Sequence, residues 1–121
     1  MVHNVPNRKT GPHDLCSIEE LMASSPKIFR FQHPVQGLHD IAIFWEESRA
    51  YALEGSCPHQ RASLAYGHVA DGVVTCPLHH ATFDLGSGQC LDGFTSDAFA
   101  YEVLIKNGRV SVVAPEEILV S

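Results

Sequence analysis

The sequence lacks the features that mark a membrane protein or a secreted one. No apolar run approaches the ~20 residues that a transmembrane helix requires. Residues 1–10 contain no apolar core of the kind found in signal peptides. The chain has only four cysteines, and nothing in the sequence pairs Cys16 with Cys90. We therefore expect a cytoplasmic protein without a disulfide framework.

Basic residues are also scarce. The 121-residue chain carries 8 Lys and Arg against 14 Asp and Glu, and its formal net charge is −6 at pH 7. Such a chain is a poor electrostatic match to nucleic acid and to anionic lipid, so we expect neither as a partner. The charge would suit a protein partner with a basic docking patch, but an acidic surface that only favours solubility explains it equally well. The length indicates a single domain.

No motif of a substrate-transforming enzyme is present. The sequence shows no Ser-His-Asp arrangement with a supporting motif, no phosphate-binding Gly loop and no facial triad of two His and one carboxylate. We therefore predict no catalytic residue. Several scattered histidines are expected at surface or core positions and not at a metal: His3, His13, His33, His39 and His68.

Two short segments each supply one thiolate and one imidazole. One residue separates Cys57 from His59, two separate Cys76 from His79, and residues 60–75 lie between the two pairs. Two facing loops could hold a two-iron cluster if each gave its Cys to one iron and its His to the other. A single zinc ion would need all four side chains at one tetrahedral point, and the spacing of Cys57 and His59 is tight for that. The cluster is favoured, and zinc stays as the alternative.

The same segments resemble the ligand signature of Rieske [2Fe-2S] proteins, in which two cysteines hold one iron and two histidines the other. The resemblance extends to the sequence around the ligands. Residues 57–64 look like the first family loop, 76–84 like the second, and 86–93 like the hairpin and the start of the third. It implies that Cys57, His59, Cys76 and His79 bind one [2Fe-2S] cluster.

Within this family the chain is most similar to the Rieske-type ferredoxins of bacterial aromatic-ring dioxygenases. The resemblance implies a soluble, monomeric electron carrier and not an enzyme. It would pass single electrons from an NAD(P)H-dependent flavin reductase to a terminal oxygenase, here an aromatic-ring-hydroxylating dioxygenase. A small subunit of a reductase complex and a ferredoxin of a diiron monooxygenase are alternatives within the family. A zinc-stabilised interaction module is the alternative outside it.

Three positions depart from the family pattern. Arg61 and His80 stand where the family usually has Gly, and Phe94 stands where the third loop usually has Pro. Gly adopts positive φ and permits close backbone approach, whereas Arg and His do neither freely. His80 could also compete with its neighbour as a ligand. We predict His79, because the spacing of Cys76 and His79 fits the family.

Other positions favour a potential at the low end of the family's range, which runs from about −150 to +300 mV. Respiratory Rieske proteins carry a disulfide where this chain has Ala62 and Leu78, and a Ser where it has Ala81. Neither the disulfide nor the hydroxyl donor can therefore be present here.

Short strands at regular spacing, separated by Gly-containing turns, predict an all-β fold. Ser17 and Glu20 have capping-box spacing and predict a short helix to about Ala23. Strands are expected at 27–32 and in hairpins at 40–45 with 50–54, 72–75 with 81–84, and 101–105 with 109–113. Large aromatic side chains are expected in the core: Phe44, Trp45, Tyr51 and Phe83.

The resemblance also implies a domain organisation. Residues 1–121 would form one domain of the Rieske (ISP-like) fold, an antiparallel β sandwich or barrel with a small inserted subdomain. The β base would comprise 14–54 and 95–121, and the cluster-binding subdomain 55–94. Residues 1–13 are polar with two prolines, and we predict a mobile or loosely docked arm.

Overall fold

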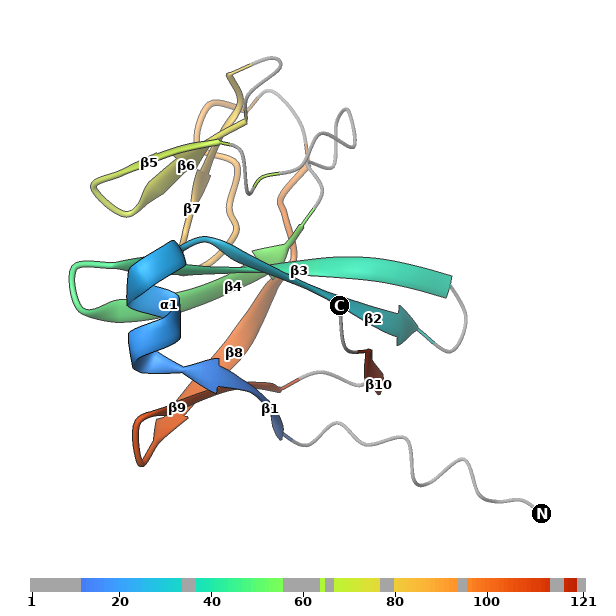
Figure 1. Ribbon diagram of the computed structural model, residues 1–121. Coiled ribbons are helices and arrows are strands. Elements are labelled where there is room, and N and C mark those ends of the chain that lie inside the picture. The colour runs from blue at the N-terminus through green and yellow to red at the C-terminus, as the bar shows by residue number, and fades with distance from the viewer. Residues whose placement is uncertain are drawn as a thin grey trace.

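The computed structural model describes residues 12–33, 37–55, 64, 67–76, 80–93, 96–113 and 117–119. Within these residues, antiparallel strands form two sheets (Figure 1). In sheet order, the larger sheet comprises β1 (Pro12–Ser17), β9 (Arg109–Val113), β8 (Ala100–Lys106), β4 (Arg49–Glu54), β3 (Gly37–Glu46), β2 (Lys27–His33) and β10 (Glu117–Leu119). The smaller comprises β5 (His68–Ala70), β6 (Val73–Thr75) and β7 (Thr82–Asp84). The predicted all-β class is confirmed.

A single short helix, α1 (Ile18–Ser24), is the only helix among the described residues. Its predicted capping box is confirmed. Glu20 N donates to Ser17 Oγ at 3.0 Å, and Ser17 N donates to Glu20 Oε1 at 2.8 Å. Leu21 is fully buried and fixes the helix against the larger sheet. No helix in the described part of the chain is long and apolar enough to cross a bilayer.

Strands β3, β4 and β8 carry apolar side chains on both faces, because successive residues of a strand point to opposite sides. One face packs inside the curled larger sheet, in a cluster that contains Cys16, Leu21, Ile41, Ile43, Ala52, Val110 and Val112. We call this the base cluster. The other face packs against the smaller sheet, in a cluster that contains Ala42, Phe44, Leu53, Leu64, Val74, Cys76, Ala81, Phe83, Leu85, Cys90 and Ala98. We call this the joining cluster, because it unites the two sheets.

The predicted core aromatics are confirmed, with different degrees of burial. Phe44 and Phe83 are fully buried in the joining cluster, and the half-buried Tyr51 packs against it. The half-buried Trp45 packs against the base cluster.

Two of the predicted hairpins have tighter turns than expected. Glu47 and Ser48 have φ of 52° and 65° between β3 and β4, and Asn107 and Gly108 have φ of 53° and 76° between β8 and β9. Positive φ at both central residues is the geometry of a two-residue turn that matches the strand twist. Strands 27–32, 40–45 and 109–113 are confirmed, with small extensions at their ends.

The N-terminal prediction is wrong for residues 12 and 13. They belong to β1, which pairs with β9 from Pro12 opposite Val113 to Ser17 opposite Arg109. Arg109 also binds Asp14 through two hydrogen bonds, of 3.1 and 2.7 Å. Residues 1–11 lie outside the described residues. The pairing with a distant strand orders a segment whose own sequence is a poor strand former.

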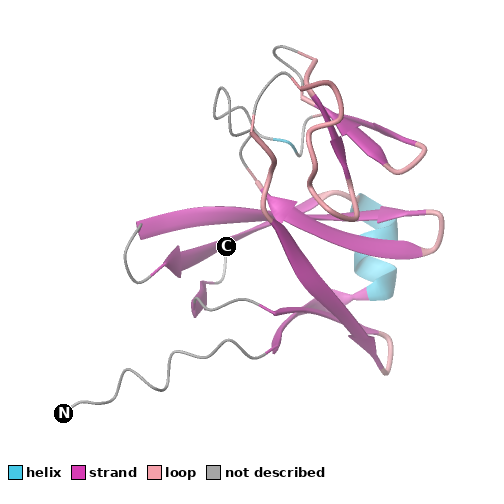
Figure 2. Cartoon of the chain, turned by 180° about the vertical axis from the view of Figure 1, so that it is seen from behind, coloured by secondary structure: helices cyan, strands magenta, loops and turns pink. Residues whose placement is uncertain are grey.

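The smaller sheet lies against the upper end of the larger one, beside the β3–β4 hairpin (Figures 1 and 2). The chain leaves the larger sheet at Glu54 and re-enters it at Ala100. Glu54 N donates to Phe99 O at 2.8 Å, and Phe99 N donates to Glu54 Oε1 at 2.7 Å, so both crossing segments are tied together. Gly72 N donates to Glu46 Oε1 at 2.8 Å and adds a second tie.

Candidate metal centre

Cys76 is the one predicted ligand that falls within the described residues. It directly follows β6, and it is fully buried in the joining cluster with no disulfide partner. Cys57, His59 and His79 lie outside the described residues. The two other described cysteines, Cys16 and Cys90, are also free, and they sit in different apolar clusters. No disulfide therefore links Cys16 to Cys90.

The second ligand segment is closed at its base by two backbone hydrogen bonds. Cys76 N donates to Ala81 O at 2.7 Å, and His80 N donates to Cys76 O at 3.1 Å. These bonds continue the ladder between β6 and β7, where Thr75 faces Thr82. The hairpin therefore holds Cys76 and His80 side by side, and residues 77–79 connect two fixed ends.

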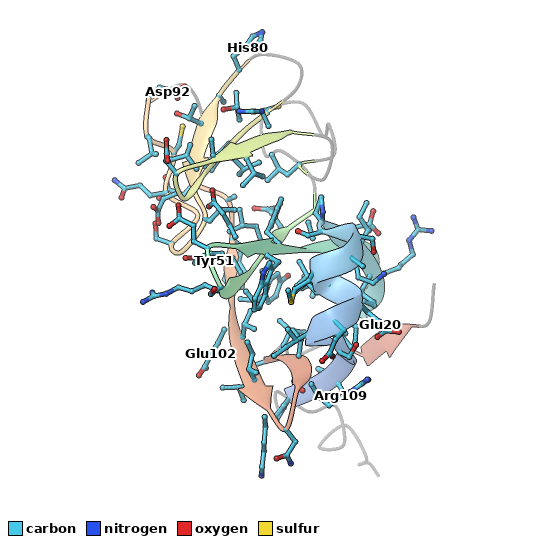
Figure 3. All side chains as sticks on the ribbon, turned by 60° about the vertical axis from the view of Figure 1, so that its left-hand side comes forward. Glu20, Tyr51, His80, Asp92, Glu102 and Arg109 are labelled. Carbon is cyan, nitrogen blue, oxygen red and sulfur yellow. The ribbon has the colours of Figure 1, made fainter. Side chains whose placement is uncertain are left out.

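His80 adopts the left-handed backbone conformation, with φ of 62°. His80 thus has a positive φ although it stands where the family usually has Gly. A non-Gly residue in this conformation costs about 1–2 kcal/mol. Its side chain is exposed, and Figure 3 shows it at the outer end of the small sheet, pointing away from the molecule. This exposure agrees with a surface position beside the centre, and His79 as the ligand stays a prediction.

The first ligand segment is also closed where it begins and ends. Leu64 N donates to Gly55 O at 2.8 Å, and Gly67 N donates to Leu64 O at 2.9 Å. A Cβ on Gly67 would collide with Thr75 O, so the backbone after this segment runs directly against the residue before Cys76. Leu64 and Cys76 are both fully buried in the joining cluster. The end of the first ligand segment therefore lies beside the start of the second.

This arrangement fits a cluster held between two loops. A thiolate ligand has to be shielded from bulk water, and the residue that supplies it, Cys76, has no exposed surface. The ends of both ligand segments are fixed by backbone hydrogen bonds, as a site with its donors on two sides requires. No group of three or more His, Cys, Asp or Glu suited to a metal occurs in the described ranges, which include Cys76 but not the other predicted ligands.

Two of the scattered histidines fall within the described residues. His13 is half-buried in β1, and His68 is exposed in β5. The side chains of His33 and His39 and the whole of His3 lie outside the described residues.

A third segment, described at 90–93 and 96–98, follows β7 and pairs with it at Cys90, and no ligand was predicted in it. Asp92 and Asp97 anchor it: Thr82 N donates to Asp92 Oδ2 at 3.2 Å, and Cys90 N donates to Asp97 Oδ1 at 2.8 Å. Short carboxylates in a turn-rich segment commonly bond nearby backbone amides, and this was the available sequence signal. Phe94, the third departure from the family pattern, lies outside the described residues.

Comparison with known proteins identifies what the chain is similar to. The family model described as the Rieske [2Fe-2S] domain matches residues 12–102, which is more than half of the chain. The 3-phenylpropionate/cinnamic acid dioxygenase ferredoxin subunit of Photorhabdus laumondii subsp. laumondii is 31% identical over 105 residues, covering 85% of this chain and 94% of that protein. The ferredoxin component of the alkene monooxygenase system of Xanthobacter autotrophicus is 29% identical over 100 residues, covering 82% and 78%.

A similar chain also occurs in a solved structure, described as the complex of reduced oxygenase and oxidised ferredoxin in carbazole 1,9a-dioxygenase. The two chains superpose with a TM-score of 0.65 at 26% identity, and the match covers 83% of this chain and 99% of that one.

Proposed function

Because this chain belongs to the family of Rieske [2Fe-2S] domains, we propose that Cys57 and Cys76 bind one iron of its cluster and that His59 and His79 bind the other. This assignment is supported by the backbone hydrogen bonds that close both ligand segments and by the full burial of Leu64 and Cys76 at their ends. The family match favours the cluster over zinc. The chain is a ferredoxin-type electron carrier and supplies no catalytic residue.

A bound Rieske cluster accepts and releases one electron at a time. The protein's own contribution is to hold the ligands still and to exclude water from the cysteine side. Leu64, Cys76 and Ala81 are almost completely buried, so the inner side of the centre faces an apolar interior. The exposed His80 marks the opposite, solvent side of the second segment. We assign electron exit to this side, where the histidine ligands would lie.

The partners follow from the named relatives. The named relatives support a terminal oxygenase as the acceptor, an aromatic-ring-hydroxylating dioxygenase. As the donor we propose an NAD(P)H-dependent flavin reductase. The net charge of −6 would favour a basic docking surface on either partner. We assign the protein to the cytoplasm as a monomer. A diiron monooxygenase is the second candidate acceptor, because one relative belongs to an alkene monooxygenase system.

Analysis of the purified protein tests this proposal directly. It should contain about two irons and two acid-labile sulfides per chain, and it should be red-brown. After reduction it should give an EPR signal whose average g value lies below that of clusters with four cysteine ligands. A colourless protein with one zinc per chain would contradict the proposal. Reoxidation of the reduced protein by a purified dioxygenase component or by a monooxygenase component would then distinguish the two acceptors.

A further inference from the structure

The third segment runs beside β7 as a short additional strand. Phe83 and Cys90 form an antiparallel bridge, with Asp84 N donating to Gln89 O at 2.9 Å and Leu91 N donating to Thr82 O at 2.8 Å. In a regular ladder the next bond would run from the amide of Thr82 to the carbonyl of Leu91. Here the ladder ends, and a side chain accepts the hydrogen bond of the Thr82 amide instead.

The side chain in question is Asp92. Its Oδ2 accepts from Thr82 N at 3.2 Å, while its Oδ1 accepts from the Cys90 thiol at 3.1 Å. One carboxylate thus bridges β7 and the segment that follows it, and Figure 3 shows Asp92 at the same outer end of the small sheet as His80. Hydrogen bonds to a charged acceptor are stronger than those between neutral groups. The carboxylate is therefore held in a defined place despite its exposure.

That place adjoins the second ligand segment. Thr82 directly follows Ala81, whose carbonyl accepts the amide of Cys76 at 2.7 Å. At the other end of the same segment, Asp97 Oδ1 accepts a hydrogen bond from Cys90 N, and this bond ties Asp97 to the residue that pairs with β7. The negative charge of Asp92 is thereby fixed beside the hairpin that carries Cys76 and the predicted ligand His79.

From this contact geometry we infer that Asp92 is a positioning residue that lowers the reduction potential of the centre. The inference rests on the proposed function. Reduction adds one electron and hence one unit of negative charge to the centre, and a nearby fixed anion disfavours that change. The Cys90 thiol contributes by holding the carboxylate in place.

The test compares midpoint potentials, measured by spectroelectrochemical titration of the purified, cluster-containing protein. Asp92→Asn keeps the shape of the side chain and removes its charge. It should raise the potential, so that the reduced-to-oxidised ratio at a fixed solution potential rises about threefold to tenfold, about 30–59 mV for one electron. Asp71→Asn is the matched control, because exposed Asp71 lies in the β5–β6 turn, at the opposite end of β6 from Cys76. It should leave the potential unchanged.

A second pair of variants keeps the charge of Asp92 and changes only the Cys90 side chain that donates to its carboxylate. Cys90→Ala removes the thiol donor and should raise the potential in the same direction by a smaller amount, whereas Cys90→Ser restores a donor and should return it towards the wild-type value. Equal potentials in Asp92→Asn and Asp71→Asn would overturn the inference, as would equal potentials in the two Cys90 variants. A wild-type protein without a Rieske spectrum would instead overturn the proposed function.

Discussion

At the scale of single residues, the second ligand segment contains two adjacent histidines, His79 and His80. His80 is exposed, and its amide bonds Cys76 O, so its backbone is committed to closing the loop. His79 occupies the family's ligand position but lies outside the described residues. The two histidines therefore make a matched pair for testing which one binds iron.

We predict that His79→Ala loses the intact Rieske absorption and EPR spectra, because the outer iron would lack one of its two imidazole ligands. His80→Ala should keep both spectra with at most a small shift in potential. Iron content and visible absorption of the two purified variants check this prediction. The opposite pattern would mean that the second segment binds the cluster in a different register.

At the scale of secondary-structure elements, backbone amides donate hydrogen bonds to glutamate side chains where the two sheets adjoin. The amide of Gly72, in the β5–β6 turn, donates to Glu46 Oε1, and the carbonyl of Gly72 accepts from Leu85 N at 2.9 Å. This turn is thus fixed on one side by β3 and on the other by the end of β7. Because Glu46 is half-buried, its hydrogen bond contributes more to the stability of the fold than a solvent-exposed hydrogen bond would.

Removing that acceptor should weaken the contact between the sheets. Glu46→Ala is expected to lower the free energy of unfolding by about 1.5–3 kcal/mol, the range for hydrogen bonds to charged groups. Glu46→Gln keeps an oxygen acceptor and should lose clearly less. Denaturant unfolding gives the energies, and hydrogen exchange of the Gly72 amide locates the effect. Equal losses in the two variants would show that the charge matters and the hydrogen bond does not.

Strand β1 has an electrostatic tie of its own. The hydrogen bonds from Arg109 lower the pKa of Asp14 below its ordinary value of 3.8 and raise the pKa of Arg109. Because the folded-state pKa of Asp14 is the lower one, its contribution to stability is present above pH 3.8 and is lost as the pH falls through the folded value. The pair is exposed, so its contribution is small and screened by salt.

We therefore predict that Asp14→Asn reduces stability near neutral pH and that its difference from wild type disappears as the pH falls below 3.8. The measurement is urea unfolding at a series of pH values from about 7 down to 3. In an Arg109→Gln background, Asp14→Asn should have little effect at any of these pH values. A difference from wild type that grows on acidification would contradict the assigned direction of the pKa shift.

At the scale of the whole molecule, the described residues form two apolar clusters, and strands β3 and β4 contribute side chains to both. The base cluster lies inside the larger sheet and contains no predicted ligand. The joining cluster contains Cys76 and also Leu64, where the first ligand segment ends. Because metal binding couples to folding, loss of the cluster should loosen the joining side first.

Removal of iron with a chelator under reducing conditions tests this coupling. Amides of Val74 and Phe83, in the smaller sheet, should exchange with solvent deuterium much faster than in the cluster-containing protein. Amides of Val110 and Val112, in the base cluster, should change far less. Uniform acceleration throughout the molecule would show instead that the two clusters unfold as one unit.

The sequence by itself determined the features that depend on local chemistry. The paired Cys and His segments predicted a cluster and the family to which the chain belongs, because ligand type and spacing are properties of a few adjacent residues. The ligand assignment itself stays a prediction. Ser17 and Glu20 specified the start of the helix for the same reason. Alternating apolar residues located the central strands and the all-β class.

Only the tertiary structure decided the features that join distant parts of the chain. β1 is ordered by its pairing with β9, and Asp14 meets Arg109 across 95 positions of sequence. The short strands β5 and β10 were likewise not expected, because each is defined by its pairing with another strand, β5 with β6 and β10 with β2. The anchoring roles of Asp92 and Glu46 depend on which backbone amide reaches their carboxylates. Sequence spacing cannot encode such contacts, since they exist only after the strands have paired and the two sheets have packed together.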